Sequence, residues 1–159
     1  GRTVDFKNTI IILTSNLGSP YILEGIGEDG QITEEARKSV ERLLRQQFRP
    51  EFLNRLDEIV FYKPLTKTEI LSIVDLLMKD LNSRLHDKQL SVTLTPAARD
   101  YVVDQGYDPV YGARPLKRFL QSRVETLIAR MIIGQDLAPR TRIVVDYDGT
   151  QLTATPQPE

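Results

Sequence analysis

A short, continuous apolar run lies near the start of the sequence. Residues 8–16, Asn-Thr-Ile-Ile-Ile-Leu-Thr-Ser-Asn, are rich in β-branched residues and show no apolar–polar alternation. A run of this kind is typical of a strand that is buried on both faces of a parallel sheet. We therefore predict a buried strand here, followed by a loop over residues 18–32, which are rich in Gly, Pro and acidic residues.

Helical spacing of the apolar residues follows this loop. Thr33 is placed to cap a helix whose apolar face continues to Phe48. The chain restarts after Pro50 as a short helical turn. Residues 57–63 then predict a second strand, which Pro64 ends.

A second helix-and-strand series begins after Pro64. Thr66 and Glu69 form a capping box that opens a long amphipathic helix, and residues 89–94 predict a strand. The next helix is expected to run from Thr95 as its N-cap to Gly106 as its C-cap.

The last part of the chain predicts one more helix and a hairpin. The helix spans about residues 115–133, and a strand within residues 140–148 turns at Asp148 and Gly149 into a second strand. We expect residues 156–159 to be frayed.

These patterns predict an α/β protein with two domains. Residues 1–63 read as part of an α/β layer that lacks a complete sheet, and residues 64–159 as a small, self-sufficient α+β domain. The chain begins with Gly rather than Met, so we expect it to be a fragment of a longer protein.

Composition narrows the possible functions. The net charge is −1 and the pI about 6.0, which predicts no nucleic-acid partner, since such partners need a basic face. No apolar run approaches the ~20 residues of a membrane span, so we expect no membrane partner. The absence of cysteine fits a cytoplasmic location. His86 is the only histidine, and its polar neighbours favour a solvated helix end over catalysis.

One formal motif is set aside. Gly25, Gly27 and Gly30 spell G-x-G-x-x-G, but no strand runs directly into them, and Glu28 and Asp29 would repel a phosphate. We do not interpret them as a dinucleotide site.

Two polar residues are candidates for chemistry in the first domain. Asn16 follows the predicted buried strand, where open α/β sheets place ligands, although an asparagine that serves the turn is equally consistent. Arg55 follows a turn that we expect Phe48 and Phe52 to hold against the core. Its local sequence alone favours a salt bridge with Asp57 or Glu58, or simple solvation.

Arg114 is the candidate in the second domain. It directly precedes Pro115, which biases it out of helical geometry at the start of a predicted helix. Lys117 and Arg118 add positive charge in the same first turn, where the helix dipole favours anions. The alternatives are a solvated basic helix and a site that awaits an anionic ligand.

Taken together, these segments resemble the end of an AAA+ ATPase module of the Clp family. Residues 9–16 resemble the strand that ends in the sensor-1 asparagine, and residues 48–60 resemble the arginine-finger segment. Residues 106–118, GYDPVYGARPLKR, resemble the start of the sensor-2 helix. The resemblance is strongest to the second nucleotide-binding domain of the bacterial protein disaggregases of this family. It implies the C-terminal part of a RecA-like large subdomain, followed by a small lid domain.

The resemblance also implies a role for each residue. Asn16 would be sensor 1, Arg55 an arginine finger acting on the nucleotide of the adjacent subunit, and Arg114 sensor 2 at the phosphates. Three further residues would line the adenine pocket: Leu65, Ile73 and Ala113.

The family further implies ATP or ADP with Mg²⁺, a homo-hexamer, a DnaK-type chaperone system as partner, and aggregated polypeptides as substrates. No G-x-x-x-x-G-K-[ST] loop and no apolar strand ending in paired acids occur in the chain. We therefore expect the fragment alone to be inactive. Two alternatives stay open, namely a Clp unfoldase that feeds a protease and a non-catalytic module for ring assembly.

Overall fold

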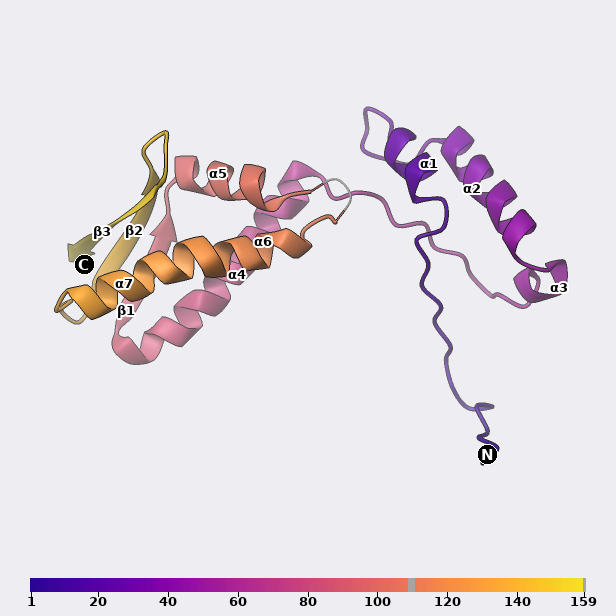
Figure 1. The fold of residues 1–159 in the computed structure, drawn as a ribbon, viewed down its shortest axis with the longest axis horizontal. Coiled ribbons are helices and arrows are strands. Elements are labelled where there is room, and N and C mark those ends of the chain that lie inside the picture. Colours follow the sequence, from indigo (N-terminus) through magenta and orange to yellow (C-terminus); the bar gives the residue numbers. More distant parts are fainter. Residues whose placement is uncertain (109–110, 159) are drawn as a thin grey trace. The chain divides into compact units, whose positions relative to one another are not determined.

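The computed structural model describes residues 1–108 and 111–158. By its contacts the chain separates into two units, which we call unit 1 (Gly1–Lys63) and unit 2 (Pro64–Glu159). Figure 1 labels their elements. Unit 1 holds α1 (Ser19–Glu24), α2 (Glu34–Gln47) and α3 (Pro50–Leu53). Unit 2 holds α4 (Lys67–Leu85), η1 (His86–Lys88), β1 (Leu90–Leu94), α5 (Pro96–Gly106), α6 (Arg114–Phe119), η2 (Leu120–Glu125), α7 (Thr126–Gly134), β2 (Thr141–Tyr147) and β3 (Leu152–Pro158).

Unit 1 is a helical hairpin with extended segments on either side. The predicted cap of α2 is confirmed, since the Thr33 hydroxyl accepts a hydrogen bond from the Ala36 N–H at 3.3 Å. Gly18 lies at φ +78° before α1, and a Cβ there would meet Val40 at 2.9 Å. The helix α1 itself was not predicted. Its signal is Pro20, which lies in the first turn, where proline is well tolerated.

Both strands predicted in unit 1 are wrong for this structure. The segments 8–16 and 57–63 form no strand, and Ile10 and Ile12 are 92% and 82% exposed. A strand needs a neighbour to bond its main chain. Unit 1, which is described in full, pairs main chains across only one isolated bridge, Ile26 with Ile32. The apolar pattern therefore has no sheet to enter within unit 1.

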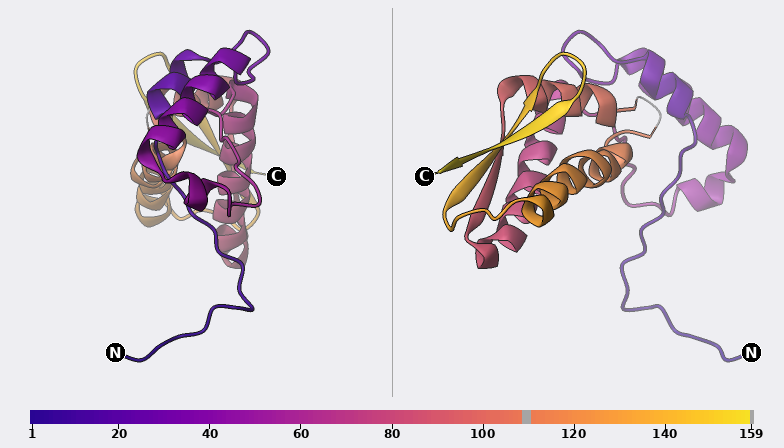
Figure 2. Two further views of the ribbon diagram at one scale, coloured as in Figure 1. Left: turned by 90° about the vertical axis from the view of Figure 1, so that its right-hand side faces the viewer. Right: turned by 60° about the vertical axis from the view of Figure 1, so that its left-hand side comes forward.

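A three-stranded sheet in the order β1-β2-β3 organises unit 2. β1 runs parallel to β2, and β3 runs antiparallel to it. Burial alternates along β1 and β2, so that one face of the sheet is covered and the other is open. Figure 2 shows α4, α5 and the long helix that begins at α6 lying on the covered side. The chain is therefore an α/β fragment, as predicted.

The local helix signals of unit 2 are confirmed with one exception. Thr66 and Glu69 form both bonds of the capping box, and Thr95 caps α5. Gly106, expected as a C-cap, is instead the last buried residue of α5. A Cβ on Gly106 would lie 2.5 Å from Leu116 Cδ1, so this glycine permits a close approach of α5 and α6.

The helix predicted over residues 115–133 forms, with a π-helical turn, η2, at its centre. Its buried row is spaced by four residues: Leu116, Leu120, Val124 and Ile128. Four residues of α-helix advance about 40° beyond a full turn, so this row would drift around the helix. The wider π turn offsets that drift and keeps the row on the core.

The chain ends in a strand rather than in a frayed tail. The predicted turn forms, with Asp148 Oδ1 accepting hydrogen bonds from the N–H groups of Thr150 and Gln151, both at 2.8 Å. β3 then pairs with β2 as far as Pro158 opposite Thr141, and Glu159 lies outside the described residues. None of the helices in the described ranges has the length and apolar character needed to cross a membrane.

Candidate functional site

Arg114 occupies the mouth of the long helix in unit 2. It is the first residue of α6, and Ala113 is the N-cap. The Arg114 N–H donates a hydrogen bond to the Tyr111 carbonyl at 3.4 Å. The preceding loop is closed by a reciprocal pair of main-chain hydrogen bonds between Asp108 and Gly112, 3.1 and 2.6 Å long. Gly112 adopts φ +64°, which favours glycine. These two hydrogen bonds hold the main chain just before Arg114, and so they position the start of the Arg114 side chain.

Close packing fixes the first turn of α6 as well. Leu116 is fully buried, and the absent side chain of Gly106 lets α5 lie directly against it. The arginine is thus mounted on a rigid base while its own side chain is exposed.

The charge of Arg114 has no partner in the described part of the chain. The first turn of α6 contains no acidic residue. None of the ion pairs among the described residues involves Arg114, Lys117 or Arg118. Cations at a helix start oppose the macrodipole, and like charges four residues apart repel each other. An anion bound here would relieve both costs.

The three residues that the resemblance assigned to the adenine pocket share one environment. Each is partly buried and packs on the edge of the unit 2 core: Leu65, Ile73 and Ala113. Their exposed parts are apolar, which suits contact with a flat aromatic ring.

Asn16 lies on the turn that leads into α1. Its carbonyl accepts bonds from the Ser19 N–H at 3.2 Å and the Ser19 hydroxyl at 2.6 Å. Its side chain is exposed, and no described hydrogen bond engages its amide. The main chain of Asn16 serves the turn, while its side chain is available to a ligand.

Arg55 follows α3, and its N–H donates to the Phe52 carbonyl at 3.1 Å. The side chain is exposed, and none of the described ion pairs joins it to Asp57 or Glu58. Of the two readings that the local sequence favoured, the salt bridge does not form, and the exposed side chain is consistent with simple solvation. Phe48 and Phe52 stack on each other with ring centroids 5.3 Å apart, but both stay more than one-third exposed. The expectation that they anchor this turn in a core is wrong within unit 1.

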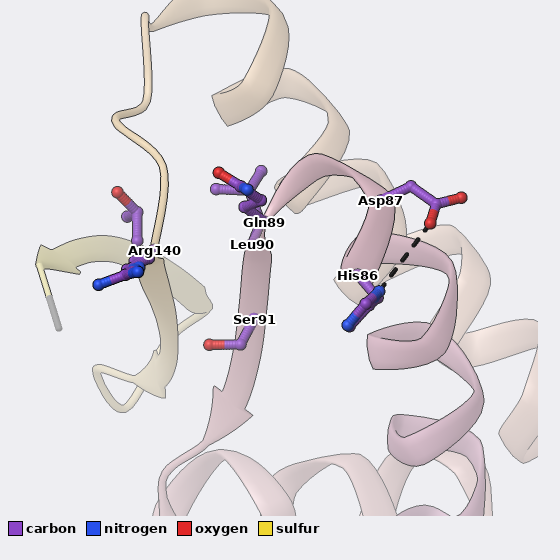
Figure 3. Close-up of a pocket in the computed structure, with 7 residues that line it drawn as sticks. His86, Asp87, Gln89, Leu90, Ser91 and Arg140 are labelled. Carbon is purple, nitrogen blue, oxygen red and sulfur yellow. Dashed lines mark ion pairs between the residues drawn. The ribbon is translucent and has the colours of Figure 1, made fainter.

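Two cavities of unit 2 have linings that include neither Arg114 nor Leu65, Ile73 or Ala113. One, of about 490 Å³, is lined by η1 and the starts of β1 and β2, including His86, Ser91 and Arg140 (Figure 3). Its labelled polar side chains do not converge on one point. His86 is 88% exposed there, in keeping with the prediction of a solvated helix end.

The second cavity, of about 230 Å³, lies between α4 and η2. Arg84 and Glu125 close its rim with a two-pronged contact, whose Nη2–Oε1 distance is 2.6 Å. The hydrogen bond that Arg84 donates to the Glu125 carboxylate raises the pKa of Arg84 above its ordinary value. Lys117 also lines this cavity, beside Asp80 and Glu125.

The glycine motif set aside above has a structural explanation. Gly25 ends α1, and a Cβ on it would lie 2.2 Å from the Ala36 Cβ. The Gly27 N–H donates to the Gln31 carbonyl at 2.8 Å, which closes the loop on itself. These glycines serve a tight turn.

Asn82 makes a partly buried polar contact that sequence reasoning missed. From α4 its amide donates to the Val92 carbonyl at 3.0 Å and accepts from the Val92 N–H at 2.7 Å. An asparagine on the inner side of a helix only weakly indicates a contact with a strand, since the residue that it meets, Val92, lies ten residues further along the chain.

Comparison with known proteins agrees with this geometry. Residues 65–145 match the family model described as the C-terminal, D2-small domain of ClpB protein, and residues 1–59 match an AAA domain of the Cdc48 subfamily. The chain is 54% identical over 152 residues to the chaperone protein ClpB of Bacillus anthracis, covering 96% of this chain. It is 51% identical over 146 residues, 92% of its length, to ClpB of Nitratidesulfovibrio vulgaris, and 50% identical over 155 residues, 98% of its length, to ClpB 2 of Synechocystis sp..

The α/β fold and the AAA match place the chain in the class of AAA+ proteins. Since the D2-small model matches just over half of it, the chain belongs to the ClpB family and corresponds to the C-terminal part of the D2 region. It spans only 17–18% of the length of these relatives.

Proposed function

We propose that this chain is the C-terminal part of the second ATPase domain of a ClpB-like protein disaggregase. The family match supports the proposal, and the single observation that carries it is the unpartnered cation Arg114 at the mouth of a rigidly packed helix. A nucleotide phosphate would supply the missing anion.

The proposed roles follow the separate units. Unit 1 is the end of the large subdomain, in which Asn16 acts as sensor 1 and Arg55 as an arginine finger toward a neighbouring subunit. Unit 2 is the small lid domain, in which Arg114 acts as sensor 2. The exposed side chains of these residues, free of described ion pairs, are compatible with such roles.

The residues fit a nucleotide but not its metal ion. Arg114 suits a phosphate, and Leu65, Ile73 and Ala113, each partly buried against the unit 2 core, offer apolar surface that suits adenine. Within the described residues, no cluster of three or more His, Cys, Asp or Glu side chains could hold a metal ion. Magnesium ligands would therefore come from other parts of the protein, and ATP would supply the phosphoryl group.

The parent assembly that we infer is a cytoplasmic homo-hexamer that uses ATP to thread aggregated polypeptides through its pore, together with a DnaK-type chaperone system. It has no nucleic-acid or membrane partner in this proposal. A protease-coupled unfoldase and a non-catalytic ring-assembly module are the competing functions. A docking loop for a peptidase would favour the unfoldase. Variants that lose ring assembly but still bind nucleotide would favour the assembly module.

The test is Arg114→Ala in the longer parent protein, measured by nucleotide affinity and ATP turnover. A charge-assisted contact contributes about 1.5–3 kcal/mol, so affinity is expected to fall about ten- to a hundredfold. Arg130→Ala is the matched control, because Arg130 is exposed on α7 of the same long helix and forms no described ion pair. If Arg114→Ala leaves both affinity and turnover at the level of Arg130→Ala, sensor 2 is lost from the proposal.

A further inference from the structure

The sheet of unit 2 has two outer edges, one along β1 and one along β3 (Figure 1). An outer edge presents unpaired N–H and C=O groups to which the strand of another chain can add. Different residues lie at the two edges here, two prolines on β3 and an asparagine beside β1.

The bonding of β2 determines which groups of β3 point outward. The Val145 carbonyl accepts a bond from the Thr95 N–H at 2.9 Å, so Val145 bonds toward the β1 side. Main-chain groups alternate in direction along a strand. The residues of β2 that face β3 are therefore Arg142, Val144 and Asp146, and their partners are Gln157, Thr155 and Thr153. The residues of β3 whose main chain faces outward are Leu152, Ala154, Pro156 and Pro158.

Two of these four outward positions thus have no N–H to offer. Proline lacks the donor, and in sheets it is confined to edges and bulges for that reason. A strand approaching β3 finds donors at Leu152 and Ala154 and none over the remaining half.

The β1 edge is occupied by a side chain instead. By the same alternation Leu90, Val92 and Leu94 face outward, and Val92 is the central one. The Asn82 amide makes both bonds that a neighbouring strand would make to Val92, at 3.0 and 2.7 Å. An added strand would have to displace it.

We propose that Pro156, Pro158 and Asn82 close this sheet against a further strand, in particular against the β3 edge of a second copy of the chain. The inference rests on strand register and hydrogen bonds, and it does not depend on the proposed function.

The test is Pro156→Thr with Pro158→Thr in the 159-residue chain, compared with wild type by sedimentation velocity and by hydrogen exchange of the 152–158 amides. Each new main-chain bond strengthens association about fivefold, and each of the two copies adds two donors, so four bonds give on the order of 600-fold. The expected result is a shift to larger species as the protein concentration rises. The exchange of the 152–158 amides should slow over the same range of concentrations. Thr155→Val with Gln157→Val is the matched control, because it raises strand propensity without adding an outward N–H.

Unit 1 exposes the same apolar residues in all three proteins, so its contribution to association cancels in the comparison. Two results would overturn the proposal, provided that circular dichroism shows an intact fold. One is unchanged sedimentation and exchange in the proline variant, and the other is equal association in the control. Each single proline variant should give an intermediate effect, and it serves as the readout if the double variant does not fold.

Discussion

Replacing Gly106 by alanine should destabilise unit 2, against the usual trend in helices. Alanine in place of glycine ordinarily stabilises a helix by about 0.5–1 kcal/mol. At this position the new Cβ would lie 2.5 Å from Leu116 Cδ1 and 3.0 Å from Leu116 Cα. Carbon atoms pack best at about 3.5–4.0 Å, so the two helices would have to separate.

The magnitude follows from how little Leu116 can move. Its side chain is fully buried, and one of the two contacts is to its main chain. Overpacking of this kind costs about 1–3 kcal/mol. Subtracting the middle of the range for helix propensity from the middle of the range for overpacking leaves a net loss of about 1.3 kcal/mol, or roughly 5–10 °C in the melting temperature of a domain of this size.

The measurement is thermal and chemical unfolding of the 159-residue chain. Gly134→Ala is the matched control, since Gly134 ends α7 and a Cβ there meets nothing within 4 Å. Its stability should be unchanged or slightly raised. A Gly106→Ala variant as stable as Gly134→Ala would refute the packing argument, and Arg114 would then lack the rigid base described above.

Three further predictions concern separate parts of the chain. Asn82→Leu should lower the free energy of unfolding by about 2 kcal/mol, because the N–H and carbonyl of buried Val92 lose their hydrogen-bond partner. A denaturant unfolding curve equal to that of the control Ser83→Ala, at an exposed position, would contradict this. The Thr95 hydroxyl and then the Tyr147 N–H lower the pKa of Asp146. The stability that Asp146 contributes to the folded state is therefore complete above its unfolded pKa of about 3.9. This stability is lost as the pH falls through the lower pKa of the folded state. Asp146→Asn should accordingly flatten the acid limb of a plot of melting temperature against pH, and an unaltered limb would exclude the effect. Arg55→Ala in the parent should lower kcat by on the order of 10³-fold while sparing affinity for a non-hydrolysable analogue. Activity should reappear in rings mixed with a subunit that cannot bind nucleotide, and no recovery in verified mixed rings would count against action across subunits.

The sequence by itself determined the features of this protein that depend on near neighbours in the chain. The caps at Thr33, Thr66 and Thr95 each accept a hydrogen bond from an N–H three residues on. The turn at Asp148 closes within the same distance. Such contacts form wherever the local backbone allows them, so residue type and spacing suffice to predict them.

The candidate site was predictable only in part, for a related reason. Sequence placed Arg114 at a helix start with other cations, because that is a local fact. It did not show that the described acidic residues leave Arg114 unpaired, nor did it decide between a salt bridge and simple solvation for Arg55, which forms no described ion pair. Ion pairing depends on where every charge ends up in space.

The tertiary structure alone decided the rest. Residues 8–16 carry the pattern of a buried strand, yet they remain exposed and unpaired, because a strand exists only beside another strand. Gly106 has the sequence position of a helix cap but serves the contact with Leu116. Asn82 reads as an ordinary helix residue until β1 lies against it. The partner residue or strand in each case is not a near neighbour in the sequence. No local pattern therefore predicts which residues it contains.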